Sequence, residues 1–503
     1  MKKIYKRKAG HEIGKYLTKM IRRLETVKFL NIFVGIFSFS LVLIFLRIEN
    51  NTRYMWDSGG YYWFSLNFVQ DGRFAITNYP ITIRGIIYPL LLHFFNRVAY
   101  FIWEDTIYGW WLLISTLSGI FATVFPLAFK NISIKGYIFP IPLILLLIVW
   151  RGLFISPLSD LVALYFLVFA LIAIKMAYSR KNEKEPLGIY EIVLFFISGA
   201  LLYAVYNTRA IYLAILPGIL LIMFINRQRR MISNIIIISF ILFGVFSVGV
   251  IQGISNRSNF GEFSILVPSN VARGDGPGHF QEALFYGLVL NFYKGYVPDD
   301  APGAFSYWSS PGNLIARRHN IHLSSSYLEH LNIVRKYPIE MLGSYVRSFL
   351  VYINPMWGGG YAFTAGGNSR FFFLVFNYTS IFVVFVYLKR NFFESPLKET
   401  LNKIKFLSRD IKTELAFFLV LFLPFLAVIP VHPEERYAIS FWLIIYVLLS
   451  HVINLKHEFV RYKKLPASYV IAYLLGFGVL VSILTEIYAN NIANMLFPLL
   501  YFN

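Results

Sequence analysis

Cysteine is absent from this chain of 503 residues, and acidic residues are few. The first absence excludes disulfide bonds, thiolate nucleophiles, cysteine-ligated zinc and iron–sulfur clusters. Charged residues make up only 15% of the sequence, while hydrophobic residues make up 57% and the mean hydropathy is +0.59. This composition is too apolar for a soluble globular protein, and it predicts an all-α polytopic membrane protein.

The sequence patterns of several well-known catalytic sites are also missing. The chain has no phosphate-binding loop of the form G-x-x-x-x-G-K-[ST], no H-E-x-x-H, no G-x-S-x-G and no glycine-rich dinucleotide fingerprint. The acid at Asp57 is not part of an Asp-x-Asp pair, because position 59 is a glycine. We therefore expect neither a metal ion nor an organic cofactor.

Apolar runs predict about eleven membrane-spanning helices, within a range of 10 to 13. The run at 136–150 is short for a span, and the tail 487–503 is interrupted by Asn and Pro. We expect that tail to lie at the membrane interface, with a twelfth span as the alternative. The expected spans lie near 29–47, 107–129, 136–150, 160–178, 189–207, 209–226, 231–251, 369–388, 414–431, 437–455 and 467–485.

The formal net charge of +21 indicates membrane sidedness, and no nucleic-acid partner is expected. With the N-terminus in the cytoplasm, the inner segments hold 30 of the 47 Lys and Arg residues. These segments are 1–28, 130–135, 175–186, 226–230, 389–412 and 455–464. The abundance of Ile, Phe, Lys, Tyr and Asn is typical of an AT-rich bacterial genome, so we predict a multi-pass protein of the bacterial plasma membrane.

One segment decides this topology. The stretch 84–97 could itself be a span, but every later Lys cluster would then face outward. We therefore predict that it lies on the outer surface as a juxtamembrane helix, and that 61–69 forms a second one. The resulting organisation is a basic cytoplasmic tail (1–28), an N-terminal membrane module (29–251) with an outer loop (48–106), a mixed extracytoplasmic subdomain (252–368) and a C-terminal membrane module (369–503).

Two acids are expected on the outer side. Asp57 follows the first span among aromatic residues, and Asp160 begins the fourth span. A carboxylate at a membrane boundary is unfavourable unless it has a task. The plain alternatives are an exposed loop acid for Asp57, and for Asp160 a helix cap or a first-turn acid that the helix dipole favours. The rings of Tyr61 and Tyr62 could stack on a sugar, or they could belong to the aromatic belt at the membrane interface.

Three arginines from separate segments, Arg84, Arg209 and Arg436, are expected near the same outer boundary. A guanidinium suits phosphate oxygens because it is always charged and donates in a bidentate fork. The alternative is that these are arginines at helix ends that reach toward water. His432 is suited to proton transfer or to phosphate contact, with a polar cap as the alternative.

These features, in this order, resemble the GT-C superfamily of membrane glycosyltransferases, which includes protein O-mannosyltransferases and bacterial aminoarabinose transferases. The segment 84–90 is similar to the family's R-P-P-L-Y-P-L type, from which it departs at Gly85 and Ile86. Ser159-Asp160 and Thr208-Arg209 are similar to the Ser-Asp and Thr-Arg pairs that open two of the family's spans. Segment 432–437 resembles the H-x-R-Y type with two additional Glu residues, and Tyr337-Pro338 resembles the family's N-P segment.

The resemblance implies a GT-C-like fold and an inverting, metal-independent sugar transfer on the outer face. The donor would be a polyprenyl-phosphate sugar in the membrane, and the acceptor a hydroxyl of a glycan, a lipid-linked glycan or a protein. Asp57 would be the general base, and Asp160 a sugar-binding acid. Arg84, Arg209 and Arg436 would bind the phosphate.

Two other readings stay open at this point. The first is a glycan polymerase or ligase that uses a polyprenyl-diphosphate donor. The second is a lipid or solute transporter, which would place charged residues along a path through the bilayer.

Overall fold

Apolar helices make up most of the part of the chain that the computed structural model describes. This part comprises residues 29–50, 56–80, 84–129, 141–179, 187–226, 231–268, 279–294, 305–308, 310–321, 326–353, 368–389, 408–431, 435–454 and 467–494. Within it, six helices are long and apolar enough to cross a membrane: Asn31–Glu49, Thr106–Ala128, Ser159–Tyr178, Ile189–Thr208, Met231–Phe260 and Arg409–Val428. Four shorter apolar helical stretches follow the same pattern, at Ala210–Ile225, Leu374–Leu388, Arg436–Ser450 and Ala467–Ile483.

A helix occurs at each of the eleven expected places, which confirms a largely helical fold and is consistent with the predicted multi-pass membrane protein. The number of eleven spans stays a prediction, because six of the described helices meet the length and apolarity of a span and the described part of 136–150 contains the nine-residue α6 (Ile141–Val149). The other bundle helices are α2 (Phe29–Glu49), α5 (Gly109–Ala128), α7 (Arg151–Ile155), α8 (Ser159–Tyr178), α9 (Ile189–Thr208), α10 (Leu216–Ile225) after the 3-10 turn η3 (Ala210–Ile215), α11 (Met231–Phe260), α16 (Asn368–Leu388), α18 (Arg409–Val428), α19 (Ile439–Asn454) after η5 (Glu435–Ala438), and α21 (Ala467–Asn494).

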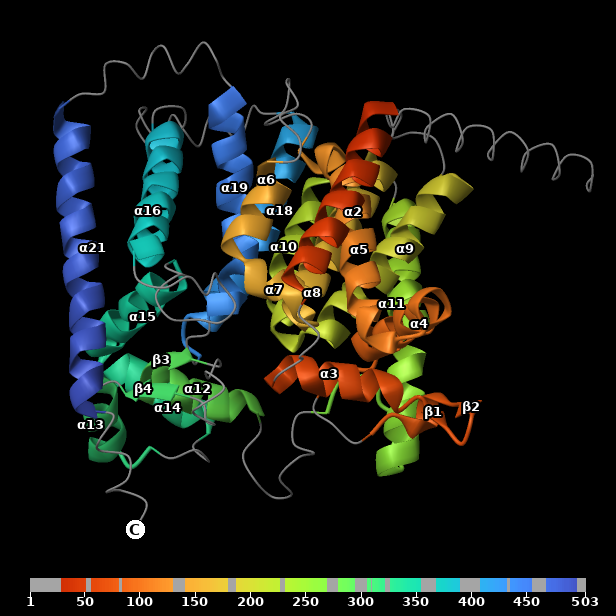
Figure 1. The fold of residues 1–503 in the computed structure, drawn as a ribbon, viewed down its shortest axis with the longest axis horizontal. Helices are drawn as coiled ribbons and strands as arrows, with labels where there is room; N and C mark the ends of the chain where they lie inside the picture. The colour runs from red at the N-terminus through yellow and green to blue at the C-terminus, as the bar shows by residue number, and fades with distance from the viewer. Residues whose placement is uncertain are drawn as a thin grey trace, which may run out of the picture.

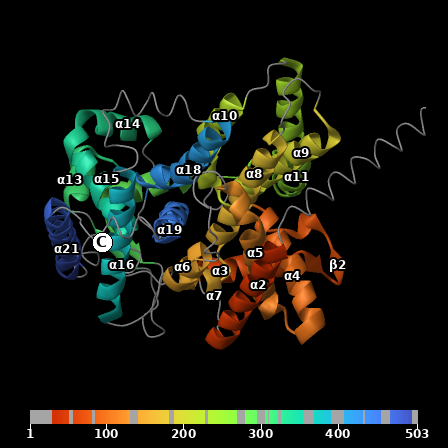
Figure 2. The same cartoon turned by 90° about the horizontal axis from the view of Figure 1, so that it is seen from above.

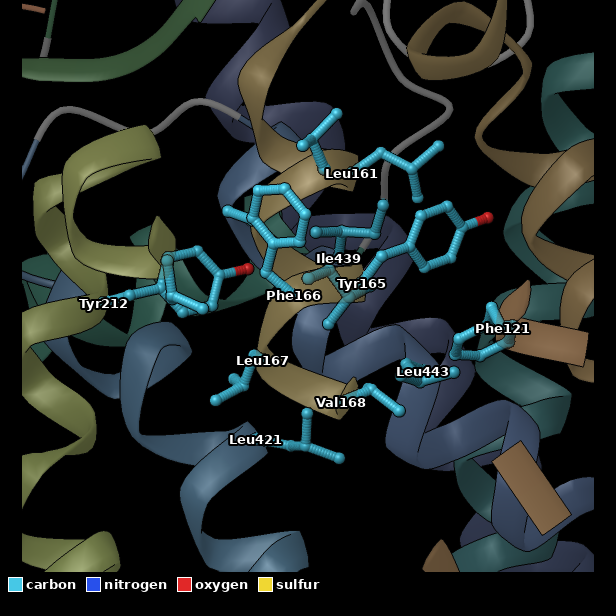
Figure 3. Close-up of a cluster of buried hydrophobic side chains, with 14 of the residues drawn as sticks. Phe121, Leu161, Tyr165, Phe166, Leu167, Val168, Tyr212, Leu421, Ile439 and Leu443 are labelled. Atoms are coloured by element: carbon cyan, nitrogen blue, oxygen red, sulfur yellow. The ribbon is translucent and has the colours of Figure 1, made fainter. Parts of the chain in front are cut away.

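Helix α8 lies at the centre of the bundle. It contacts α5, α7, α9 and α19, and 83% of its apolar stretch is buried inside the protein. Figure 2 shows α8 between α9 and α18. In Figure 3 its side chains lie among residues of α5, η3, α18 and α19; the labelled residues are Phe121, Leu161, Tyr165, Phe166, Leu167, Val168, Tyr212, Leu421, Ile439 and Leu443. A helix that is apolar on all sides is suited to the interior of a large protein or to a membrane, and α8 is the most buried of the six span candidates in the described part of the chain.

Two helix pairs pack through glycines. A Cβ at Gly199 of α9 would lie 2.0 Å from the carbonyl oxygen of Ile241 of α11, and one at Gly244 would lie 2.1 Å from that of Phe196. On α2, a Cβ at Gly35 would meet Thr123 of α5 in the same way. Small residues allow backbones to approach closely, which is a principal source of helix association within a membrane.

A buried ion pair joins helices at the C-terminal end of α8. Lys175 pairs with Glu414 of α18, and its Nζ also donates to the carbonyl oxygen of Ala128 of α5 (2.9 Å). Nearby on α18, Thr413 accepts a hydrogen bond from Asn226 at the end of α10 (2.9 Å). Because Glu414 is fully buried, removing either charge would leave the other uncompensated. This end of the bundle is therefore held in one register.

The opposite end of α8 lies next to surface elements that come before α5 in the chain. Helix α3 (Trp56–Leu66) lies across the lower end of the bundle in Figure 1, followed by the hairpin β1 (Val69–Gln70) and β2 (Arg73–Phe74) and the turn η1 (Ile76–Asn78). Asp71 and Gly72 both have positive φ (50° and 74°), as a two-residue hairpin turn of type I′ requires. Helices are thus present close to the two predicted places, 61–69 and 84–97, as α3 and as α4 (Ile87–Trp103), and their position on the outer surface stays a prediction.

Helix α4 is not among the six span candidates in the described part of the chain. It packs on α3, α5 and the turn η2 (Thr106–Tyr108) with one face, which includes Tyr88, Leu92 and Asn96. Its other face exposes Phe94 and Phe101. Whether this helix lies at the interface, as predicted, or spans the membrane stays a prediction.

A mixed region lies between α11 and α16, within the predicted outer segment 252–368. It comprises α12 (His279–Val289), an antiparallel pair of β3 (Leu290–Lys294) and β4 (Phe305–Trp308), α13 (Ser310–Arg318), α14 (Tyr327–Lys336) and α15 (Pro338–Tyr352). Leu288, Val289, Ile333 and Met341 belong to a small core of its own. Figure 1 shows this region at the same end of the molecule as α3.

We predict that Gly199→Ala lowers the free energy of unfolding by about 1–3 kcal/mol, because the added Cβ forces α9 away from α11. The measurement is thermal unfolding of the purified protein in detergent. Gly478→Ala on α21 is the matched control, since a Cβ there meets nothing within 4 Å. Equal melting temperatures for the two variants would contradict the close packing of α9 on α11.

Candidate functional site

Five charged side chains from five separate segments meet near the N-terminal end of α8. They are Asp57 in the first turn of α3, Arg84 just before α4, Asp160 in the first turn of α8, Arg209 at the end of α9 and Arg436 in η5. Ion pairs connect all five, and we refer to them as the ion network. The sequence analysis selected each of these residues, and the structure brings them together.

Asp57 joins two of the arginines. Its Oδ1 pairs with Arg84, and its Oδ2 accepts a hydrogen bond from Arg436 Nη2 (2.8 Å). The plain alternative of an exposed loop acid does not hold, because Asp57 lies in a helix, is ion-paired and has a side-chain exposure of 26%.

These charges control the protonation of Asp57. Burial opposes its ionisation, but the charges of Arg436 and Arg84 outweigh burial and hold the pKa of this carboxyl well below its ordinary value. A carboxyl group whose pKa is depressed by folding stabilises the folded protein at pH values above its ordinary pKa. This contribution is lost only as the pH falls toward the depressed pKa. Asp57 is therefore a carboxylate throughout the neutral range.

Asp160 holds the third arginine. Its Oδ1 accepts a hydrogen bond from Arg209 Nε (2.8 Å) and also lies 2.7 Å from Arg209 Nη2. Its Oδ2 lies 3.8 Å from Arg436 Nη1 and has no hydrogen-bond partner among the described residues. The N-cap of α8 is Leu158, so Asp160 is not the helix cap, but it does lie in the first turn, where the helix dipole favours an acid. One oxygen of this buried carboxylate is thus left for a further donor.

Arg436 lies between the two carboxylates. It is 3% exposed, which excludes the alternative of an arginine that reaches into water. A guanidinium this deeply buried depends on its carboxylate partners for stability.

Aromatic rings support the guanidinium groups. The Cζ of Arg84 lies 4.6 Å from the ring centre of Tyr61, and the ring of Tyr437 lies 4.8 Å from Arg209 Cζ and 5.5 Å from Arg436 Cζ. Such contacts fix the plane of a guanidinium and offset part of its desolvation. Tyr61 also hydrogen bonds through its hydroxyl to Ser159 (2.9 Å), which ties α3 to α8.

The sequence analysis did not give Tyr437 or Ser159 a role of its own. Tyr437 follows Arg436 directly, and Ser159 precedes Asp160. Adjacency to a selected charged residue is the signal that could have found both.

The remaining selected residues behave differently. Tyr62 hydrogen bonds through its hydroxyl to Thr106 (2.7 Å), at the connection between α4 and α5. The described contacts thus bring Tyr61, but not Tyr62, to the ion network. His432 lies outside the described residues.

The composition of the site suits an anion. Three arginines and two carboxylates leave one net positive charge in the ion network. In the described part of the chain, no group of three or more His, Asp or Glu side chains is placed to hold a metal ion. A single phosphodiester charge would neutralise the network.

No known protein family model matches the chain, and neither the curated proteins nor the solved structures include a match to it.

We predict that Asp160→Asn lowers the free energy of unfolding by about 3–5 kcal/mol, because it leaves the buried guanidiniums of Arg209 and Arg436 short of one carboxylate. Thermal unfolding in detergent at neutral pH measures the effect. Asp71→Asn is the control: Asp71 is exposed in a hairpin turn that accepts Asn-Gly. A melting temperature for Asp160→Asn as high as that of the control would show that the pairing contributes little.

Proposed function

We propose that this protein is a membrane glycosyltransferase that moves a sugar from a polyprenyl-phosphate donor to an acceptor hydroxyl, with inversion at the anomeric carbon. The observation that carries the proposal is the ion network, in which three arginines surround two carboxylates at one end of a bundle of apolar helices. In the proposed topology this is the outer face of a bacterial plasma membrane. The acceptor is a glycan, a lipid-linked glycan or a protein.

The charge of the network favours a monophosphate donor. A sugar joined to a polyprenyl chain through one phosphate has a single negative charge, which equals the net positive charge of the network. A diphosphate donor has more charge than the described residues of the network neutralise. The arginine side chains donate in the planar fork that matches two phosphate oxygens.

Asp57 has two successive tasks in this proposal. Without donor, its two oxygens occupy Arg84 and Arg436, so it stands where a phosphate would pair. A donor phosphate competes for the same guanidinium nitrogens. Once they turn to the phosphate, the pKa of Asp57 rises because the charges that depressed it are neutralised.

The released carboxylate then serves as the general base. It accepts the proton of the acceptor hydroxyl while the acceptor oxygen bonds to the anomeric carbon. The bond between that carbon and the phosphate oxygen breaks on the opposite face, and the polyprenyl phosphate leaves with the bonding electrons. The arginines stabilise the additional charge on the leaving phosphate, so no acid is needed to protonate it. A single displacement of this kind inverts the anomeric carbon.

Asp160 and the aromatic rings would complete the site. The Oδ2 of Asp160 has no hydrogen-bond partner among the described residues, so it is suited to accept a hydrogen bond from a sugar hydroxyl. Tyr61 lies beside the proposed phosphate site, because its ring contacts the guanidinium of Arg84.

We predict that Asp57→Asn lowers the transfer rate at least about 100-fold, because the base is lost. The same variant should bind polyprenyl monophosphate more tightly than the wild type, because the internal competitor for Arg84 and Arg436 is gone. Transfer is measured with purified protein in lipid and a polyprenyl-phosphate sugar, and affinity by calorimetric titration. Full transfer activity would remove Asp57 as the base, and weaker binding would remove it as a competitor.

We predict that Arg436→Ala weakens the binding of polyprenyl monophosphate by about 10- to 100-fold, as expected for the loss of hydrogen bonds to a charged group. Arg97→Ala is the control, since Arg97 is exposed on α4. Unchanged affinity in a folded Arg436→Ala variant would exclude this residue from the phosphate site.

The identity of the consumed donor separates the proposal from its closest rival. Mass spectrometry of the lipid products should show a monophosphate after transfer. Release of a polyprenyl diphosphate would instead establish a glycan polymerase or ligase.

A further inference from the structure

Three buried amide side chains form a continuous chain of hydrogen bonds beside the ion network. Gln252 of α11 accepts through Oε1 from the backbone N–H of Ile86 (3.1 Å) and from Asn207 Nδ2 of α9 (2.9 Å). Asn207 Oδ1 accepts from the backbone N–H of Ile87 (2.8 Å). Gln252 Nε2 donates to Asn256 Oδ1 (2.8 Å). We call Asn207, Gln252 and Asn256 the amide relay.

The relay has a fixed direction. It begins at two backbone donors, the N–H groups of Ile86 and Ile87, which require side-chain oxygens. It ends where Asn256 Nδ2 donates to the carbonyl oxygen of Leu266 (2.8 Å) and to that of Ser264. The oxygens of Asn207 and Gln252 must therefore face these backbone donors, which leaves the nitrogen of Asn207 to donate to Gln252 and that of Gln252 to donate to Asn256. The three side chains are between 2% and 4% exposed, so water does not offer these groups other partners.

The segment held in this way contains Arg84. Residues 84 to 86 are not helical, and their conformation depends on side-chain contacts. The hydroxyl of Tyr79 lies 3.2 Å from the carbonyl oxygens of Arg84 and Gly85, to which it donates. Ile86 is fully buried in a small core with Phe68 and Tyr79. The relay adds the contacts that join this segment to α9 and α11.

Gly85 shows how close this contact is. A Cβ at Gly85 would lie 1.9 Å from the carbonyl oxygen of Asn207 and 2.4 Å from its Oδ1. The segment therefore packs directly on the last turn of α9, which ends at Thr208, just before Arg209. Asn207 thus sets the distance between Arg84 and Arg209.

We propose that Asn207, Gln252 and Asn256 are positioning residues, which hold Arg84 at the spacing from Arg209 and Arg436 that a bound phosphate requires. This rests on the proposed function, in which that phosphate belongs to the donor. The relay consists of neutral amides, so it adds no charge to the site and works unchanged across the neutral pH range. Its members act through Arg84 and do not themselves contact the donor.

A double-mutant cycle on affinity for polyprenyl monophosphate tests this inference. Gln252→Met keeps the size of the side chain and removes both its acceptor and its donor. We expect it to weaken binding about tenfold in the wild-type background, and to have no further effect in an Arg84→Ala background, where the positioned group is gone. A general loss of structure would weaken binding in both backgrounds.

The control is a buried amide at the other end of the bundle. Asn226 is 2% exposed and hydrogen bonds with Thr413, so Asn226→Leu should lower the melting temperature and leave the affinity unchanged. Gly85→Ala is a second test variant, which displaces the same segment by a backbone clash and leaves the relay chemically intact. We expect it to show the same dependence on Arg84.

The possible failures are distinguishable. If the wild type does not bind polyprenyl monophosphate, the proposed function fails. If the wild type binds and Arg84→Ala weakens binding, but Gln252→Met and Gly85→Ala do not, the positioning role fails alone. It also fails if Gln252→Met weakens binding equally in both backgrounds.

Discussion

The burial of the Arg436 guanidinium is the constraint on which the site depends. A charge that is 3% exposed requires compensating charges, because its transfer from water is otherwise strongly unfavourable. Asp57 from α3 and Asp160 from α8 lie on its two sides. Each of these carboxylates has a second arginine partner. The buried charge of Arg436 is therefore compensated by a network of residues that come from five separate segments of the chain.

Hydrogen bonds between uncharged groups add to the ion pairs in holding these segments together. The ion pairs join the ends of long, flexible arginine side chains to the carboxylates, so they leave more freedom to the backbone than hydrogen bonds to the backbone itself. Amide groups accept and donate in defined directions, and they specify where the backbone before α4 lies on α9. Residues 207 to 209 take part in both systems, through Asn207 and Arg209. The two kinds of interaction thus share the end of one helix.

Much of the fold could be predicted from the sequence, because a backbone in lipid has to satisfy its own hydrogen bonds and an apolar run therefore becomes a helix. From the distribution of Lys and Arg, the two acids and three arginines of the ion network were predicted to lie on one side of the membrane. In the structure they meet at one end of the bundle. Helix lengths were less predictable: α6 has only nine residues, and η3 forms the start of the segment that continues as α10. A hydropathy average over a long stretch of sequence does not reveal where a helix ends or changes type.

The partners within the site could not be predicted from spacing. Asp57 and Arg436 are 379 positions apart, and only the folded bundle brings them together. Tyr61 and Tyr62 looked equivalent in the sequence, but α3 turns them to different neighbours. The amide relay did leave a signal, since Gln252 and Asn256 are polar residues four positions apart in an apolar helix. The glycine at position 85 is explained by its contact with Asn207, since any Cβ there would meet the carbonyl oxygen of that residue.

Ion pairs fix α8 near both of its ends, through Asp160 at one and Lys175 at the other. These residues are separated by roughly 22 Å at 1.5 Å of helix rise per residue, which is most of the thickness of a hydrocarbon layer. The helix cannot slide along its axis without breaking a buried pair. It therefore fixes the distance between the ion network and the opposite end of the bundle, and under the proposed function a lipid headgroup bound at the network would be held at a constant height above the hydrocarbon core.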